Sequence, residues 1–94
     1  MPAYVSATVA VKDPEKLQVY LSHLPATLAP FGGKLVCRGK VAKVLEGKAA
    51  FQIMATFEFA DVETAEAWYQ SDAYQALIPN RDEALEGTIV ILQS

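Results

Sequence analysis

Two segments of alternating apolar residues, each followed by an aspartate, constrain the fold of this chain more than any other feature. In "YVSATVAV" (residues 4–11) and "FQIMATFEF" (residues 51–59), apolar side chains recur at every second position, which is the period of a β-strand. Asp13, followed by Pro14, and Asp61 are expected to cap the next helices, because a carboxylate there accepts hydrogen bonds from free backbone N–H groups. The sequence therefore predicts two strand–helix units.

The segment between these units is expected to supply two further strand pieces. We expect Pro25 to break or kink the first helix, and Pro30 with the following glycines to end it. "KLVCRG" (residues 34–39) is typical of a strand, and "KVAKVLEG" (residues 40–47) is predicted to continue it after a bulge or tight turn at Gly39. The middle of the chain is thus predicted to be mostly β-structure.

The C-terminal part is expected to be helical before a last strand. The second helix should run from Val62 to about residue 70, and a further helical piece should start near Ser71. Gly87 is expected to stop the helical region before the strand "TIVILQ" (residues 88–93). The resulting order, β-α-β-β-α-β, predicts an α+β ferredoxin-like protomer with the first and third strands at its centre and both helices on one face. We expect residues 1–94 to form this single domain.

The apolar content of the chain predicts self-association. A chain of 94 residues buries only about two thirds of its unfolded surface, yet 52% of its residues are hydrophobic. In a two-layer fold, the sheet face away from the helices stays bare unless a second copy covers it. We therefore expect a homodimer that packs sheet to sheet and encloses a polar-lined cavity. The residues predicted for this second face are Tyr4, Ser6, Thr8, Gln52, Met54, Thr56 and Glu58.

Charge and composition argue against several classes of function. A net charge of −3 with eight scattered Lys and Arg residues does not provide the basic surface that nucleic-acid binding needs. No run reaches the length of a membrane span, no signal peptide is evident, and the single cysteine, Cys37, fits a reducing compartment, so the cytoplasm is expected. We expect no metal and no cofactor, because the single histidine, His23, has no companion ligands at a suitable spacing.

Two motifs carry a resemblance to a known family: "APFGG" at residues 29–33 and "WYQSDAYQALIPNR" at residues 68–81. On these motifs the chain resembles the bacterial family of domain of unknown function 1330 (DUF1330), within the dimeric α/β-barrel superfamily. The resemblance implies a ferredoxin-like protomer that pairs into a barrel, and it implies no reaction. Relatives in the wider superfamily include cofactor-free monooxygenases, lactone isomerases, haem proteins and stress-responsive proteins. The matching positions are Tyr4, Tyr20, Gly32, Gly33, Arg38, Gly39, Glu46, Gly47, Trp68, Tyr69, Ser71, Tyr74, Gln75 and Arg81.

The predicted function is the binding of a small aromatic or anionic organic molecule in the barrel cavity. A non-enzymatic, stress-linked or accessory dimer with a merely hydrated cavity is the alternative, and a cofactor-free monooxygenase or isomerase is a further one. We assign no catalytic residue. The candidate pocket consists of Tyr4, Thr8, Gln52, Met54, Thr56 and Glu58, with Arg38 or Arg81 holding an anionic group.

The segment from Trp68 to Arg81 leaves one question open. Trp68 is expected in the core, and the hydroxyls of Tyr69 and Tyr74 are expected to reach backbone groups that the helix break at Ser71 leaves free. Arg81 has two possible roles. It is a structural clip if it pairs with a nearby acid (Asp72, Asp82 or Glu83), and an anion holder if it points into the cavity.

Overall fold

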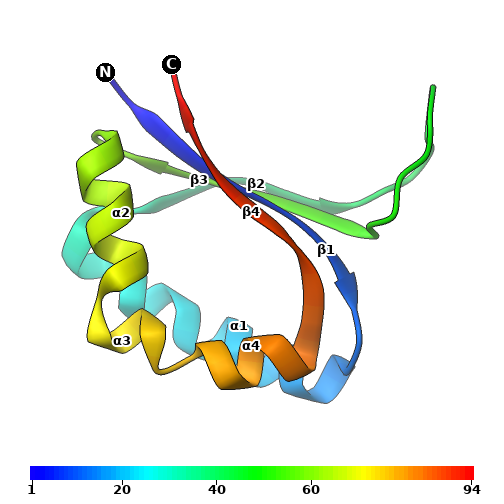
Figure 1. Ribbon diagram of the computed structural model, residues 1–94, viewed down its shortest axis with the longest axis horizontal. Helices are drawn as coiled ribbons and strands as arrows, with labels where there is room; N and C mark the ends of the chain where they lie inside the picture. Colours follow the sequence, from blue (N-terminus) through cyan, green and yellow to red (C-terminus); the bar gives the residue numbers. More distant parts are fainter.

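The computed structural model describes all 94 residues and places every helix on one side of a single sheet (Figure 1). A short 3₁₀ turn at Ala29–Phe31 follows the first helix. The other elements are β1 (Ala3–Val11), α1 (Pro14–Leu28), β2 (Lys34–Lys40), β3 (Ile53–Phe59), α2 (Val62–Gln70), α3 (Asp72–Gln75), α4 (Ile78–Ala84) and β4 (Leu85–Gln93).

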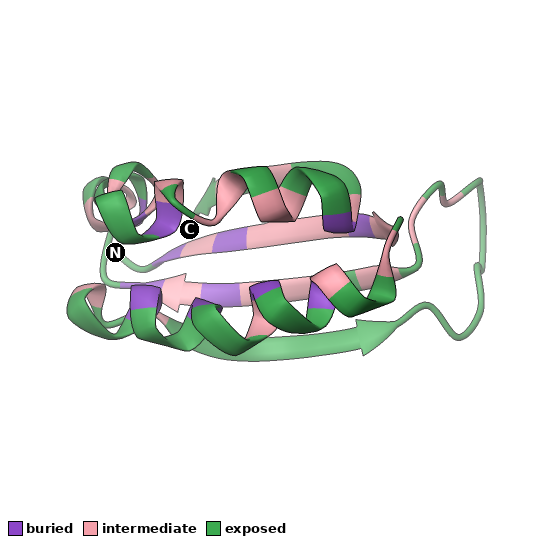
Figure 2. Cartoon of the chain, turned by 90° about the horizontal axis from the view of Figure 1, so that it is seen from below, coloured by how far each residue is buried: buried purple, intermediate pink, exposed green.

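The sheet confirms the ferredoxin-like prediction. Its strand order is β2-β3-β1-β4 and every neighbouring pair is antiparallel, so the first and third strands lie at the centre. The helices cover one face, while β2 at the sheet edge is exposed along its whole length (Figure 2). The molecule therefore has two layers, with one sheet face and one edge strand left uncovered.

Strand alternation creates the core. Val5 pairs with Phe57, and both side chains are buried beneath the helices together with Phe59. The two helix starts follow the predicted chemistry, since the Asp13 carboxylate accepts from Glu15 N–H and Lys16 N–H, and Asp61 accepts from Thr64 N–H.

Trp68 joins two helices through its indole nitrogen. Its ring is 2% exposed, which confirms the predicted core position. Nε1 of Trp68 donates to Oγ1 of Thr27 at 3.0 Å, and that hydroxyl in turn donates to the Leu24 carbonyl at 2.7 Å. The hydrogen bond connects α2 to α1 inside the core, where an unpaired N–H group would be costly.

The first helix does not break at Pro25, although a break is one of the two outcomes, a break or a kink, that the sequence predicts there. Helix α1 continues through Pro25 to Leu28, and Pro25 itself is exposed. A proline removes one backbone N–H donor, but the buried side chains of Leu24, Thr27 and Leu28 keep the last turn packed on the core.

The predicted strand at residues 40–47 does not form. Strand β2 ends at Lys40, and residues 41–50 contain no strand, because no neighbouring strand accompanies them. The irregularity in β2 falls between Leu35 and Cys37 and not at Gly39. The segment before β3 extends away from the rest of the molecule (Figure 1) and exposes Leu45 to 90%.

Gly87 lies within a strand, contrary to the prediction that it stops the helical region. It pairs with Val9 in the β1–β4 ladder. A Cβ atom at Gly87 would lie 2.0 Å from the Thr8 carbonyl oxygen and 2.8 Å from Val9 Cα, both of which are backbone atoms. The close approach of β4 to β1 therefore requires glycine at this position.

We predict that Gly87→Ala lowers the free energy of unfolding by about 3 kcal/mol, since the backbone of β1 must move to admit the methyl group. Urea denaturation measures the loss. Gly39→Ala is the matched control, because a Cβ at Gly39 in β2 meets nothing within 4 Å, and it should change stability by less than about 1 kcal/mol. Equal losses in the two variants would contradict the argument.

We predict that Thr27→Val destabilises the protein by about 1–3 kcal/mol, because it leaves the buried indole N–H of Trp68 without an acceptor. In a Trp68→Phe background, which has no indole N–H, the same substitution should cost clearly less. A thermal or urea double-mutant cycle measures the difference. An identical cost in both backgrounds would show that the hydrogen bond does not couple α1 to α2.

Candidate functional site

A cavity of about 1020 Å³ lies between α1 and the helix-facing side of the sheet. Ala7 and Ala55 explain why it is open. They pair with each other in the β1–β3 ladder and line the cavity, and their small side chains leave space where larger residues would fill it. The apolar wall includes Leu17, Leu21, Leu24 and Leu28 from α1, with Val9, Ile53, Phe57 and Ile89 from the sheet.

The charged residues that line the cavity are all cationic. Arg38 and Lys40 come from the edge strand β2, and Arg81 comes from α4, while no Asp or Glu belongs to the lining. Arg38 pairs with Ala55 and Lys40 with Ile53, so the two cationic side chains start on the helix-facing side of the sheet. An anionic group would therefore be attracted to this cavity, and a cationic group would be repelled.

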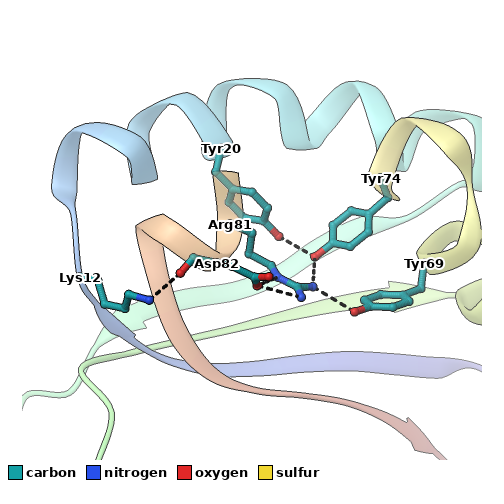
Figure 3. A network of polar contacts seen from close by, with 6 residues as sticks. All are labelled: Lys12, Tyr20, Tyr69, Tyr74, Arg81 and Asp82. Carbon is teal, nitrogen blue, oxygen red and sulfur yellow. Dashed lines mark hydrogen bonds and ion pairs between the residues drawn. The ribbon is translucent and has the colours of Figure 1, made fainter. Parts of the chain in front are cut away.

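Arg81 joins a network of tyrosine hydroxyls where α1, α3 and α4 meet (Figure 3). Its Nη1 atom donates to the Tyr69 hydroxyl at 3.0 Å and to the Tyr74 hydroxyl at 3.2 Å. The Tyr74 hydroxyl lies 2.9 Å from that of Tyr20, which lines the cavity. The network thus leads from a guanidinium to the cavity wall.

The other guanidinium atoms of Arg81 are held by Asp82. Nη2 and Nε lie 3.3 and 3.4 Å from Asp82 Oδ1, and the Arg81 side chain is 15% exposed. Burial opposes the charge of Arg81, but the hydrogen bonds to Tyr69 and Tyr74 outweigh it and raise the pKa of Arg81. Arg81 therefore remains charged, and most of its donors are already in use.

Tyr20 contributes a protonated phenol to the cavity wall. Tyr20 is 7% exposed, and its burial raises the pKa of its phenol above the ordinary value. The phenol therefore stays protonated at neutral pH, so it offers a hydrogen-bond donor and not a base. The ring packs edge-on against Tyr74 at a centroid distance of 6.4 Å.

The structure divides the predicted pocket residues between the two faces of the sheet. Arg38, Gln52 and Arg81 line the helix-side cavity, where the Gln52 side-chain oxygen accepts from Val11 N–H at 3.1 Å. The others lie on the opposite face and cannot line the same pocket of one protomer. These are Tyr4, Thr8, Met54, Thr56 and Glu58. Ligand binding by either group stays a prediction.

The open face of the sheet has its own polar contacts among apolar side chains. The Tyr4 hydroxyl donates to Glu58 at 3.4 Å, and the hydroxyls of Ser6 and Thr56 lie 3.1 Å apart. Cys37 is exposed on the same face, opposite Thr56. Large apolar side chains on this face, including Met54, Val90 and Leu92, are between 43% and 49% exposed.

The tyrosine network is the part of the site that sequence reasoning missed. Tyr20 is one of the positions that match the family, but nothing in the sequence places it next to Tyr74. The hydroxyls of Tyr69 and Tyr74 bind the Arg81 guanidinium and not the backbone groups that we expected. Ser71 itself caps the break, since its hydroxyl accepts from Tyr74 N–H and donates to the Trp68 carbonyl.

The protein has neither a cluster of residues suited to a metal ion nor a helix suited to crossing a membrane. No group of three or more His, Cys, Asp or Glu residues is placed to hold a metal ion, and His23 is exposed on α1. None of the helices combines the length and the apolar character needed to cross a membrane.

Comparison with known proteins gives one family match and many structural neighbours. The model of the family described as "Domain of unknown function (DUF1330)" matches residues 2–94. No curated protein shows significant sequence similarity to the chain.

Three solved structures illustrate the structural likeness. RPA0582 of Rhodopseudomonas palustris, a protein of unknown function, has a TM-score of 0.84 at 16% identity, over 99% of this chain and 82% of that one. A dimeric ferredoxin-like protein of unknown function from Jannaschia sp. CCS1 has a TM-score of 0.75 at 10% identity, over 100% of both chains. SnoaB of Streptomyces nogalater, a cofactor-independent oxygenase, has a TM-score of 0.72 at 8% identity, over 99% and 92%.

Proposed function

Because the chain belongs to the DUF1330 family, whose description assigns no activity, we propose a function from the geometry of its cavity: the protein binds a small organic molecule with an apolar body and an anionic group. The observation that carries this proposal is the charge of the lining. An otherwise apolar cavity of about 1020 Å³ has Arg38, Lys40 and Arg81 as its only charged lining residues. Its size is at the upper end of ordinary small-molecule sites.

The apolar wall accounts for most of the expected affinity. Transfer of an aromatic ring from water to the leucine side chains of α1 and to Phe57 is favourable by about 25 cal/mol for each Å² of apolar surface buried. The cations then select among apolar ligands by charge. Arg38 and Lys40 are exposed, so water and salt screen their contribution.

The proposed site lies within each protomer, and we propose that the protomers form a cytoplasmic homodimer. The open sheet face supports the pairing, because Met54, Val90 and Leu92 are exposed there beside the polar Tyr4–Glu58 and Ser6–Thr56 pairs. Similar proteins from Jannaschia sp. CCS1 and Thermobifida fusca are described as dimeric. A second copy on this face would cover the uncovered side of the two-layer fold.

The likeness to SnoaB concerns the fold, since 8% of residues are identical. Oxygenase or isomerase chemistry in this protein stays a prediction from the family resemblance. Binding is the property that the cavity itself supports. The alternative, a cavity that holds only water, is an outcome of the ligand experiment below.

We predict that 2-naphthoate binds more tightly than naphthalene and that 2-naphthylmethylamine binds more weakly than naphthalene, because the lining is cationic. Isothermal titration and thermal unfolding measure the three affinities. A ligand at 100 times its Kd should raise the free energy of unfolding by about 2.7 kcal/mol. If none of the three probes binds, the cavity holds only water and the proposed function is wrong.

A cavity-filling variant provides the matched control for the location of binding. Ala55→Leu adds bulk to the cavity floor and should weaken 2-naphthoate binding about tenfold or more while the protein stays folded. Ala10→Leu makes the same change on the opposite face of the sheet and should leave binding within about twofold. An equal loss of affinity in the two variants would show that 2-naphthoate binds outside this cavity.

We predict that the wild-type protein has twice the chain mass of 10.2 kDa at micromolar concentration. Val90→Lys should shift it to the monomer, because burying a lysine without a partner against a second copy would be costly. Val19→Lys, on the exposed surface of α1, should leave the dimer intact. Light scattering after size-exclusion chromatography gives the masses, and a monomeric wild type would contradict the homodimer.

A further inference from the structure

The buried hydroxyl of Tyr74 fixes the direction of the hydrogen bonds in the network. Tyr74 is 0% exposed, and its oxygen has two partners, Arg81 Nη1 at 3.2 Å and the Tyr20 hydroxyl at 2.9 Å. A guanidinium only donates, so Tyr74 accepts from Arg81. The proton of Tyr74 then has one available acceptor, the oxygen of Tyr20, and leaving it unpaired in the core would be costly.

This direction leaves the proton of Tyr20 free. If Tyr74 donates to Tyr20, the Tyr20 hydroxyl cannot donate back to Tyr74, and no other acceptor in the structure contacts it. Tyr20 lines the large cavity, whereas Tyr74 is absent from its lining. Arg81 lines the cavity as well, but most of its donors are already taken, so the Tyr20 hydroxyl is the donor of the network that remains for a cavity ligand.

The charge of Arg81 acts on the cavity through this chain of hydroxyls. Its Nη1 atom is occupied by Tyr69 and Tyr74, and Asp82 holds the opposite side of the guanidinium. Each donated hydrogen bond polarises the next, so a cation at one end makes the last hydroxyl a stronger donor. Such a donor favours an acceptor oxygen that carries negative charge.

We propose that Tyr20 is the residue that binds the charged oxygen of the ligand, and that Tyr74 orients it by relaying the hydrogen bond from Arg81. The inference rests on the proposed function and specifies it further: the ligand is an organic acid or an enolate or phenolate, with its oxygen at the Tyr20 end of the cavity. Arg81 is then a positioning residue that does not need to touch the ligand.

The test uses 2-naphthoate labelled with ¹³C at the carboxylate, with naphthalene as the probe that lacks the oxygen. Tyr20→Phe should weaken 2-naphthoate binding about tenfold and leave naphthalene binding within about twofold, because only the charged probe loses a hydrogen bond. Tyr74→Phe should weaken 2-naphthoate by about threefold, since Tyr20 keeps its proton but loses the relay from Arg81. The carboxylate ¹³C shift of the bound probe should move toward its value in water in both variants.

Ser6→Ala is the control, because it removes a hydroxyl from the open face of the sheet. It should leave the affinity and the ¹³C shift of 2-naphthoate unchanged. The role of Tyr20 would be overturned if wild type and Tyr20→Phe bound 2-naphthoate with equal affinity. It would also be overturned if the variant lost affinity equally for 2-naphthoate and naphthalene. In both cases the cavity would remain the binding site. If wild type binds neither probe, the proposed function fails and the inference fails with it.

Discussion

Helix α1 is attached to its neighbouring helices more closely than to the sheet beneath it. Three polar contacts, one to each later helix, hold it along its length. The Lys16 carbonyl accepts from Asn80 of α4, the Tyr20 hydroxyl meets Tyr74 of α3, and Thr27 accepts from Trp68 of α2. The backbone of α1 likewise lies closer to α4 than to any strand. These contacts hold α1 in place against the other helices. The core therefore stays packed although the space between α1 and the sheet is open.

The two faces of the sheet consequently differ in character. Beneath α1, the small side chains of Ala7 and Ala55 leave a cavity whose walls are apolar and whose charged residues are cationic. On the opposite face, exposed apolar side chains such as Val90 alternate with hydrogen-bonded polar pairs, which suits contact with another protein surface. A ligand site within the protomer and an interface on its other side can therefore coexist without competing for the same residues.

Local patterns in the sequence predict most of the fold, and tertiary contacts decide the rest. Alternation and aspartate caps gave β1, β3 and the starts of α1 and α2, because these signals depend on neighbouring residues alone. The helix continues through Pro25 and Gly87 lies within a strand, because packing from distant elements outweighs local preference at these positions. For the site, the sequence predicts Arg38 or Arg81 as the residue that holds an anionic group. The hydrogen bond between Tyr20 and Tyr74, which are 54 residues apart, has no signal in a single sequence.

Arg81 shows why the two roles considered for it do not exclude each other. As a clip, it holds Asp82 and two tyrosines, and it therefore stays ordered at 15% exposure. A free arginine in the cavity would lose side-chain freedom whenever an anion bound, at a cost of about 0.5–1.5 kcal/mol. A guanidinium already fixed by the fold has lost this freedom during folding, and its charge can act through Tyr74 on a hydroxyl that is also fixed. The structural clip would thus preorganise the anion site that we propose at Tyr20.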